Sequence, residues 1–375
     1  MNNDTTLPQE PAGLPPMPEG LTPAWLTQAL TEAGLLRDGA RVVTVRQAQV
    51  GEGAGMMSEL ARLHLDYAGA GGAQLPATLV AKFPSRNANN REVAMAYRLY
   101  EREVRYFAEL APRSSAPSPR TWYSRLQGSN FVILMEDMDD YRVGDQVVGA
   151  DLRESELMTD ALAHLHASFW NGVDDLDWVP RIAGSYHAQN MQALVGAGWQ
   201  NMARTFEGHL DASIAARGDA FAAALPALQA IVDTAPVTLL HGDFRMENVF
   251  FGTRPEHHPT VIIDWQGPLR GRGVVDLGLM LGQSTQHAVR VAHERELVRR
   301  YAERLAAHGV RDYGADRAWQ HYLQAQLYNW AYVAVVSGTL DAGNAHGFAW
   351  MSRMVARQSA MTLELDLFAQ LDALA

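Results

Sequence analysis

The sequence contains no cysteine among its 375 residues. This absence excludes a disulfide framework, a thiolate nucleophile and a zinc ion bound by cysteine. The N-terminal segment MNNDTTLPQEPAGLPPMPEG also lacks the basic start and the apolar core of a signal peptide. Both features favour a reducing, cytoplasmic location.

Long apolar runs and positive charge are scarce as well. No uninterrupted apolar stretch is long enough to cross a bilayer, so no membrane-spanning segment is expected. The chain has 31 Lys and Arg residues against 42 Asp and Glu residues, for a formal net charge of -11. Because a phosphate backbone is bound by a basic surface, no nucleic-acid partner is expected. The length allows two lobes, each with a core of its own.

Strand and helix signals divide the chain into a strand-rich part and a helical part. Residues 1–20 are polar and Pro-rich and predict a flexible tail. Residues 21–138 combine a helix that starts at Thr22, the strands VVTVRQAQV, ELARLHLDY and ATLVAKF, a long helix at about residues 90–110, and the strands TWYSRL and NFVILMEDM. Residues 139–375 are helical apart from one short β interruption, TLL, NVFF and TVIID. The expected fold class is α+β.

The segment HGDFRMENVFF, residues 241–251, places polar and charged residues between two apolar strands. A β-hairpin through residues 252–259 would bring Asn248 beside Asp264, which ends the strand VIID. An amide oxygen and a carboxylate are hard ligands suited to a Mg²⁺ ion that bridges the phosphates of a nucleotide. Asp243 is then left to accept a proton or to orient a hydroxyl nucleophile.

The N-terminal half supplies features that complement this segment. VGEGAGMMSEL carries Gly51, Gly53 and Gly55 between two strands, where backbone N–H groups can approach phosphate oxygens closely. Lys82, in LVAKF, is a charged residue inside an otherwise apolar strand. A buried ammonium group is costly unless an acid pairs with it, and Glu103 on the following helix is the expected partner.

Taken together, these segments resemble the protein-kinase-like fold, in the small-molecule branch that contains the aminoglycoside and choline phosphotransferases. They are most similar to the bacterial members of the ecdysteroid-kinase-like group. The resemblance implies a bilobal fold with a small antiparallel-sheet N-lobe and a mostly helical C-lobe. HGDFRMENVFF resembles the catalytic loop, which makes Asp243 the catalytic base and Asn248 a magnesium ligand. IDWQG resembles the segment whose aspartate, here Asp264, binds the metal.

The same resemblance implies that motifs of the N-lobe bind the nucleotide. VAKF resembles the strand whose lysine, here Lys82, holds the α- and β-phosphates of ATP, with Glu103 as its partner. ILMEDM resembles the hinge, where backbone groups of Glu136 and Met138 would read the adenine edge. Ser58 is expected to touch a phosphate through its hydroxyl. The glycine segment does not follow the spacing of protein kinases, which leaves open which of its amides meet the phosphates.

Other residues refine the prediction. Arg245 stands where protein kinases usually carry a lysine, and we interpret it as a cation for the transferred phosphoryl group. His241 is expected to hold the loop by hydrogen bonds. Asp276, in GVVDLGLML, resembles the helix aspartate that fixes the catalytic loop from behind. Eleven residues separate Asp264 from Asp276, too few for the activation segment that builds a peptide platform, so a protein substrate is not expected.

The predicted function is ATP-dependent transfer of a phosphoryl group to a hydroxyl of a small organic molecule. The acidic composition suits a cationic acceptor, an aminoglycoside or a choline-type alcohol. The Trp- and Tyr-rich C-terminal lobe, and the resemblance to the ecdysteroid-kinase-like group, favour an apolar alcohol such as a steroid or a hydroxyacyl thioester. Tyr328, Trp330 and Tyr332, expected on one helix, are either core residues or a wall of the acceptor pocket. A nucleotide-binding pseudokinase scaffold is the remaining alternative, which the retention of the motif residues argues against.

Overall fold

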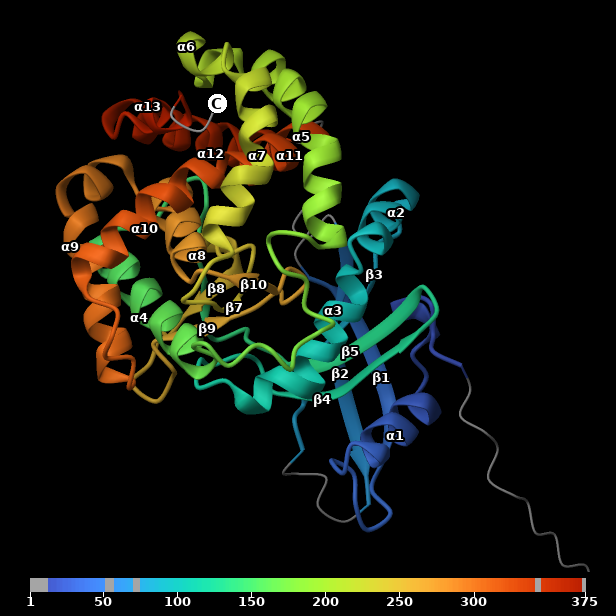
Figure 1. The fold of residues 1–375 in the computed structure, drawn as a ribbon. Helices are drawn as coiled ribbons and strands as arrows, with labels where there is room; N and C mark the ends of the chain where they lie inside the picture. The colour runs from blue at the N-terminus through green and yellow to red at the C-terminus, as the bar shows by residue number, and fades with distance from the viewer. Residues whose placement is uncertain (1–12, 51–56, 70–74, 341–344, 373–375) are drawn as a thin grey trace, which may run out of the picture. The chain divides into compact units, whose positions relative to one another are not determined.

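The computed structural model describes residues 13–50, 57–69, 75–340 and 345–372 (Figure 1). The chain divides into two compact units. The first comprises Met1–Glu109 and Pro119–Met138, and the second comprises Leu110–Ser118 and Asp139–Ala375. The glycine segment with Gly51, Gly53 and Gly55 lies outside the described residues.

The first unit is built on a five-stranded sheet in the order β1-β2-β3-β5-β4. Every neighbouring pair of strands is antiparallel, which confirms the expected sheet. The strands lie at the segments predicted from β-branched and alternating residues. Their bounds are β1 Arg41–Gln49, β2 Ser58–Ala68, β3 Thr78–Pro84, β4 Thr121–Gln127 and β5 Asn130–Glu136.

Helix α1 (Pro23–Glu32) packs on this sheet. Thr22 caps the helix by accepting a hydrogen bond from the Trp25 N–H, and proline occupies the first helical position, which confirms the predicted start at Thr22. The buried core of the unit combines apolar residues of α1 with those of the strands, among them Leu26, Leu30, Leu63, Leu79 and Leu134. Part of the predicted tail also contacts the unit, because Gln47 Nε2 donates to the carbonyl of the buried Pro18 at 2.7 Å in the short 3-10 helix Pro18–Gly20.

The prediction of a single long helix near residues 90–110 is wrong. The segment folds as α2 (Ala88–Ala96), α3 (Leu99–Arg105) and a π-helical turn, Tyr106–Leu110. Tyr97 and Arg98 separate α2 from α3, and Arg98 has a φ of 54°, in the left-handed region that an α-helix cannot continue through. No glycine or proline marks this break in the sequence. The hydrophobic periodicity also continues through it, so neither signal predicts the break.

The second unit is mostly helical. Asp151 caps helix α4 with a capping box, in which Asp151 accepts from the Glu154 N–H and Glu154 accepts from the Asp151 N–H. The helices are α4 Leu152–Ser168, α5 Tyr186–Thr205, α6 Ala212–Ala215, α7 Gly218–Val232, α8 Val274–Leu279, α9 His287–Ala307, α10 Ala315–Tyr328, α11 Trp330–Thr339, α12 Ala345–Glu364 and α13 Leu367–Asp372.

Short strands interrupt these helices. β8 (Val249–Phe251) and β9 (Thr260–Ile262) pair antiparallel, which confirms the predicted hairpin. β6 (Arg142–Val143) extends them to a three-stranded sheet, and β7 (Thr238–Leu240) pairs with β10 (Leu269–Gly271). The sequence predicts one β interruption and misses β6 and β10, because strands of two and three residues are too short to show an alternating pattern.

Helices α5 and α11 approach each other so closely that their backbones touch. A Cβ on Gly198 would lie 2.7 Å from the carbonyl oxygen of Ala334, and a Cβ on Gly338 would overlap the carbonyl oxygen of Gly198. Glycine is needed at both positions because a side chain has no room there. This contact fixes the position of α11 within the second unit.

The substitution Gly338→Ala is expected to lower the free energy of unfolding by about 1–3 kcal/mol, because the added methyl group would force the two helices apart. The matched control is Gly196→Ala on α5, where an added Cβ meets nothing within 4 Å. That change should be neutral or stabilise by up to about 1 kcal/mol, since alanine favours a helix over glycine. Urea denaturation of both variants checks the prediction, and equal midpoints would contradict it.

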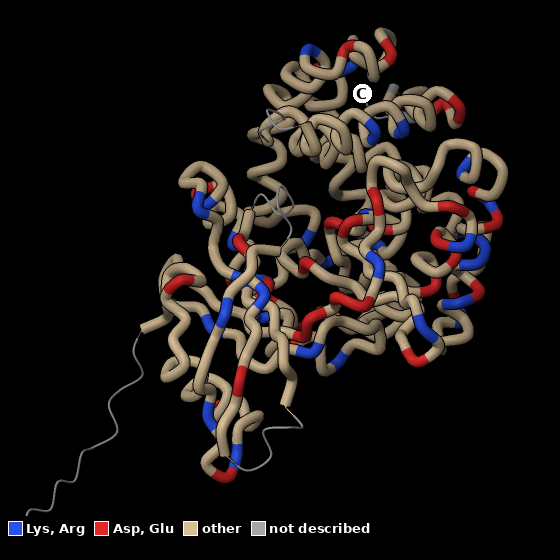
Figure 2. The backbone as a smooth tube through the Cα atoms, turned by 180° about the vertical axis from the view of Figure 1, so that it is seen from behind, with Lys and Arg blue, Asp and Glu red and all other residues tan. Residues whose placement is uncertain are grey.

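Acidic and basic residues are interspersed along the backbone (Figure 2). Helix α9 shows the pattern, because Arg299 pairs with Glu303, and Arg300 Nε lies 2.7 Å from Asp160 Oδ1 on α4.

Among the helices that the structure describes, none is long and apolar enough to span a membrane.

Candidate active site

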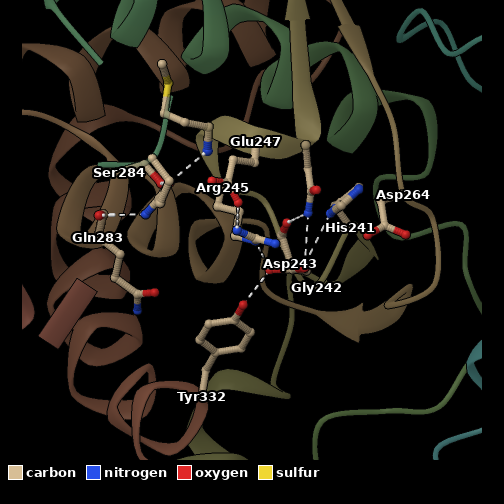
Figure 3. A network of polar contacts seen from close by, with 12 residues as sticks. His241, Gly242, Asp243, Arg245, Glu247, Asp264, Gln283, Ser284 and Tyr332 are labelled. Carbon is tan, nitrogen blue, oxygen red and sulfur yellow. Dashed lines mark hydrogen bonds and ion pairs between the residues drawn. The ribbon is translucent and has the colours of Figure 1, made fainter. Parts of the chain in front are cut away.

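The segment between β7 and β8 carries the predicted catalytic residues Asp243 and Arg245 and the predicted metal ligand Asn248 (Figure 3 shows Asp243 and Arg245). Its turn depends on Gly242, which has a φ of 81° and whose added Cβ would overlap the carbonyl oxygen of Gly267. Only glycine combines this backbone conformation with so close an approach. The turn sets the start of the loop that presents Asp243.

Asp276, on α8, anchors this turn from the protein interior. Its carboxylate is fully buried and accepts hydrogen bonds from the N–H groups of His241 at 2.6 Å and Gly242 at 3.0 Å. His166 Nε2 lies 3.3 Å from the same carboxylate, and His166 Nδ1 is 2.7 Å from the Tyr301 hydroxyl. A buried carboxylate that accepts several hydrogen bonds holds its partners firmly. Asp276 therefore has the anchoring position that the family resemblance implies.

His241 ties the loop to the end of β9. Its Nδ1 accepts a hydrogen bond from the Asp243 N–H at 3.3 Å, and its Nε2 donates to the carbonyl of Ile263 at 2.9 Å. With both ring nitrogens engaged in backbone hydrogen bonds, His241 stabilises the loop, as expected from the sequence.

Gln146 anchors the same loop further along the chain. Its side-chain oxygen accepts hydrogen bonds from the Met246 N–H at 3.1 Å and from the Ser284 hydroxyl at 2.9 Å. Its amide nitrogen donates to the carbonyl of Gln283 at 3.0 Å. No local pattern indicates this contact, because Gln146 lies 100 positions before Met246 in the chain.

Asn248 is oriented by Asp243. Its amide nitrogen donates to the Asp243 carbonyl at 2.8 Å and to Asp243 Oδ2 at 3.0 Å. The side-chain oxygen of Asn248 is therefore turned away from this carboxylate and can serve as a ligand. The Asn248 backbone carbonyl accepts from the Ile263 N–H at 3.0 Å, so the hairpin brings Asn248 next to the residue that precedes Asp264.

Asp264 follows β9 with a left-handed backbone. Its φ is 64°, a conformation that aspartate tolerates better than most residues but that still costs energy. Gln266 Nε2 donates to Asp264 Oδ1 at 2.6 Å. One amide oxygen and one carboxylate fit Mg²⁺, which prefers few protein ligands and takes the rest from water and phosphate. Within the described residues, no group of three or more His, Cys, Asp or Glu side chains forms a metal site.

Arg245 lies among carboxylates and an indole. Its Nε is 3.4 Å from Asp243 Oδ1, its Nη1 pairs with Glu247, and its guanidinium carbon lies 4.6 Å from the centre of the Trp350 ring. Burial opposes the positive charge, but the Asp243 and Glu247 carboxylates outweigh it and raise the pKa of Arg245 above its ordinary value. Glu247 also lies 3.0 Å from His346 Nε2. Arg245 is thus a permanent cation beside Asp243, and its action on a phosphoryl group stays a prediction.

The three aromatic residues predicted on one helix lie on two, because α10 ends at Tyr328 and α11 begins at Trp330. Trp330 is fully buried in the core, with its ring centroid 5.2 Å from that of Trp199. Tyr332 instead reaches the loop and donates its hydroxyl hydrogen to Asp243 Oδ1 (Figure 3). Burial first, and the Asp243 charge second, raise the pKa of Tyr332 well above its ordinary value, so the phenol stays protonated.

In the first unit, the predicted ion pair is present. Lys82 Nζ on β3 lies 2.7 Å from Glu103 Oε1 on α3, and the two residues are only 5% and 1% exposed. Ser58 is buried at the start of β2, opposite Pro84 in the strand register. These positions leave the expected contacts of Lys82 and Ser58 with phosphate as predictions.

The residues predicted to read adenine lie at the end of β5. Glu136 is the last residue of that strand, and its N–H donates to the carbonyl of Arg120 at 2.8 Å. Met138 is buried and ends the first unit. Their contacts with a nucleotide stay predictions.

The small antiparallel sheet of one unit, the helical second unit and the loop that presents Asp243 are features of the protein-kinase-like fold, in the class of the small-molecule kinase-like phosphotransferases. Residues 52–311, more than half of the chain, match the ecdysteroid kinase-like family. The chain therefore belongs to the ecdysteroid kinase-like family. A comparison with curated proteins found no matching sequence.

The chain is also similar to several solved structures. It aligns with an ethanolamine kinase of Plasmodium vivax at 10% identity and a TM-score of 0.46, covering 86% of this chain and 84% of that one. A microcompartment-associated aminopropanol kinase aligns at 14% identity and a TM-score of 0.48, covering 92% and 98%. An aminoglycoside-3'-phosphotransferase of type VIII aligns at 17% identity and a TM-score of 0.38, covering 88% and 98%.

Proposed function

We propose that this protein transfers the γ-phosphoryl group of ATP to a hydroxyl group of a small organic molecule. The observation that supports the proposal most directly is the orientation of Asn248. Its amide nitrogen holds Asp243, at 3.0 Å from Oδ2, and its amide oxygen remains for a metal ion beside Asp264. One short loop thus combines a base for the acceptor hydroxyl with a ligand for the ion that accompanies ATP.

In the proposed reaction, the acceptor oxygen forms a bond to the γ-phosphorus while the bond from that phosphorus to the bridging oxygen of ADP breaks. The proton of the acceptor hydroxyl passes to Asp243. Mg²⁺ bound by Asn248 and Asp264 would neutralise charge on the phosphates. Because phosphoryl transfer leaves little covalent work for the protein, the anchored loop contributes mainly by positioning. Arg245 adds a fixed positive charge for the transferred group.

The nucleotide is assigned to the first unit. We propose that Lys82, oriented by Glu103, binds the α- and β-phosphates of ATP. Backbone groups of Glu136 and Met138 would read the adenine edge. Further phosphate contacts are assigned to Ser58 and to the glycine segment with Gly51, Gly53 and Gly55. A cytoplasmic location stays a prediction from the sequence.

For the acceptor, we favour an apolar alcohol of the steroid or hydroxyacyl kind. Membership of the ecdysteroid kinase-like family supports this choice. The aromatic ring of Tyr332, whose hydroxyl contacts Asp243, adds apolar surface beside the loop. An aminoglycoside or a choline-type alcohol is the alternative, and a fold of this kind does not by itself choose between acceptors.

The test is ATP consumption by the purified protein with Mg²⁺ and a panel of steroids, hydroxyacyl thioesters, choline-type alcohols and aminoglycosides. We expect one class to raise ATP consumption above the rate without acceptor, and chelation of Mg²⁺ by EDTA to abolish the increase. A phosphorylated product found by mass spectrometry identifies the acceptor. Nucleotide binding without consumption on any alcohol would instead indicate a pseudokinase, and transfer of label to a protein mixture would indicate a protein kinase.

A further inference from the structure

The carboxylate of Asp243 is held on both of its oxygens. Asn248 Nδ2 donates to Oδ2 at 3.0 Å, and the Tyr332 hydroxyl donates to Oδ1. Arg245 Nε approaches Oδ1 as well, at 3.4 Å. Each carboxylate oxygen can accept about two hydrogen bonds. Oδ1 therefore accepts the hydrogen bond of Tyr332 and lies beside the Arg245 cation, whereas Oδ2 accepts from Asn248 and keeps a position for a further donor.

Tyr332 is itself fixed in place. It lies on α11, which is held against α5 by the contact of Gly338 with Gly198. At the start of α11, the Trp330 Nε1 donates to the Thr362 hydroxyl at 2.8 Å, and Asn329 Nδ2 donates to the Val275 carbonyl at 3.2 Å. Because the helix is anchored at both ends, the phenol is held against Asp243 by the fold. Its protonated state, described above, makes it a donor rather than an acceptor.

We propose that Tyr332 is a positioning residue for the base: it holds Asp243 Oδ1 and so directs Oδ2 to the acceptor hydroxyl. The inference rests on the proposed function, since it requires Asp243 to act as a base. Without the phenol hydroxyl, the carboxylate could rotate about its χ2 angle and would meet the acceptor in the productive orientation for a smaller fraction of the time. Misplacement of a catalytic group by about 1 Å can lower a rate by up to about 10²-fold.

The substitution Tyr332→Phe removes this hydroxyl and keeps the ring. We expect kcat to fall by about 10-fold, with the KM for ATP and the affinity for ATP unchanged, because Tyr332 acts on the orientation of the base and not on nucleotide binding. Steady-state kinetics with the acceptor found in the panel, together with nucleotide-binding titrations, give this split between kcat and KM.

The matched control is Tyr322→Phe on α10. The Tyr322 hydroxyl donates to Glu294 Oε1 at 2.6 Å, so this variant also loses a hydrogen bond from a phenol to a carboxylate inside the second unit. Both variants are expected to lose thermal stability, but only Tyr332→Phe should lower kcat. An unchanged kcat in Tyr332→Phe, or an equal loss in both variants, overturns the inference.

Two further results separate this inference from the proposed function. If Asp243→Ala abolishes turnover while Tyr332→Phe keeps the full kcat, the inference fails and the proposed function stands. If the unmodified protein transfers phosphate to no alcohol, both fail, because Asp243 is then not a base that needs positioning.

Discussion

Replacing Asp243 with alanine should lower kcat at least about 10²-fold while ATP still binds, because the variant lacks the group that accepts the acceptor's proton. Asp243 lies in the middle of the anchored loop, between Asn248 and Tyr332, and neither contact belongs to the predicted nucleotide-binding residues of the first unit. The measurements are steady-state ATP consumption with the identified acceptor and a titration with a fluorescent ATP analogue.

The control for this experiment is Asp219→Ala, the same chemical change at an exposed position in the first turn of α7. It should leave kcat unchanged. Near-normal turnover in Asp243→Ala would contradict the assignment of the base. If the variant loses both nucleotide binding and turnover, the loop has collapsed. A lowered thermal unfolding temperature of the variant would reveal this.

The second large effect concerns stability. The substitution Lys82→Met should lower the free energy of unfolding by about 3–5 kcal/mol, because it leaves the carboxylate of Glu103 buried without its 2.7 Å partner. It should also weaken ATP binding, through the loss of a charge assigned to the phosphates. Chemical denaturation and nucleotide titration measure the two effects separately.

The double variant Lys82→Met/Glu103→Leu distinguishes the two effects. It removes both charges, so most of the lost stability should return while ATP binding stays weak. Arg105→Met serves as the control, because Arg105 pairs with Glu109 at an exposed site, where an ion pair contributes at most about 1 kcal/mol. A Lys82→Met variant as stable as this control would show that the buried pair does not stabilise the fold.

Features that depend on neighbours in the sequence were predicted well. The start of the first helix at Thr22 and the hairpin after Asn248 both follow from residues within a few positions of one another. The pairing of Lys82 with Glu103 was predictable for another reason. A charge inside an apolar strand needs a partner, and the next helix offered one.

Breaks within helices were not predictable from periodicity. The apolar pattern runs through Arg98 and through Asn329, yet the chain starts a new helix after each of them. At Arg98 the backbone turns into the left-handed region without a glycine. At Asn329, the side chain donates to the Val275 carbonyl on α8, a tertiary contact that a local pattern cannot contain.

The surroundings of Asp243 could be predicted only in part. His241 and Asn248 lie within the same motif, and their contacts follow from a short loop. Tyr332 lies 89 positions from Asp243, and the sequence did not decide whether it is a core residue or part of a pocket wall. Trp350, which stacks on Arg245, carried no signal at all. Such contacts depend on how the helices pack, which one sequence does not reveal.

The buried anchors of the loop bear on how inactive relatives can be recognised. Asp276 and Gln146 accept hydrogen bonds from backbone N–H groups of the loop. One lies after the loop in the chain and the other before it, and neither belongs to the HGDFRMEN segment. A relative could keep every residue of that segment, and a substitution at Asp276 or Gln146 could still distort the loop and its catalytic geometry. Screening genomes for working enzymes of this family should therefore score the anchors together with the motif.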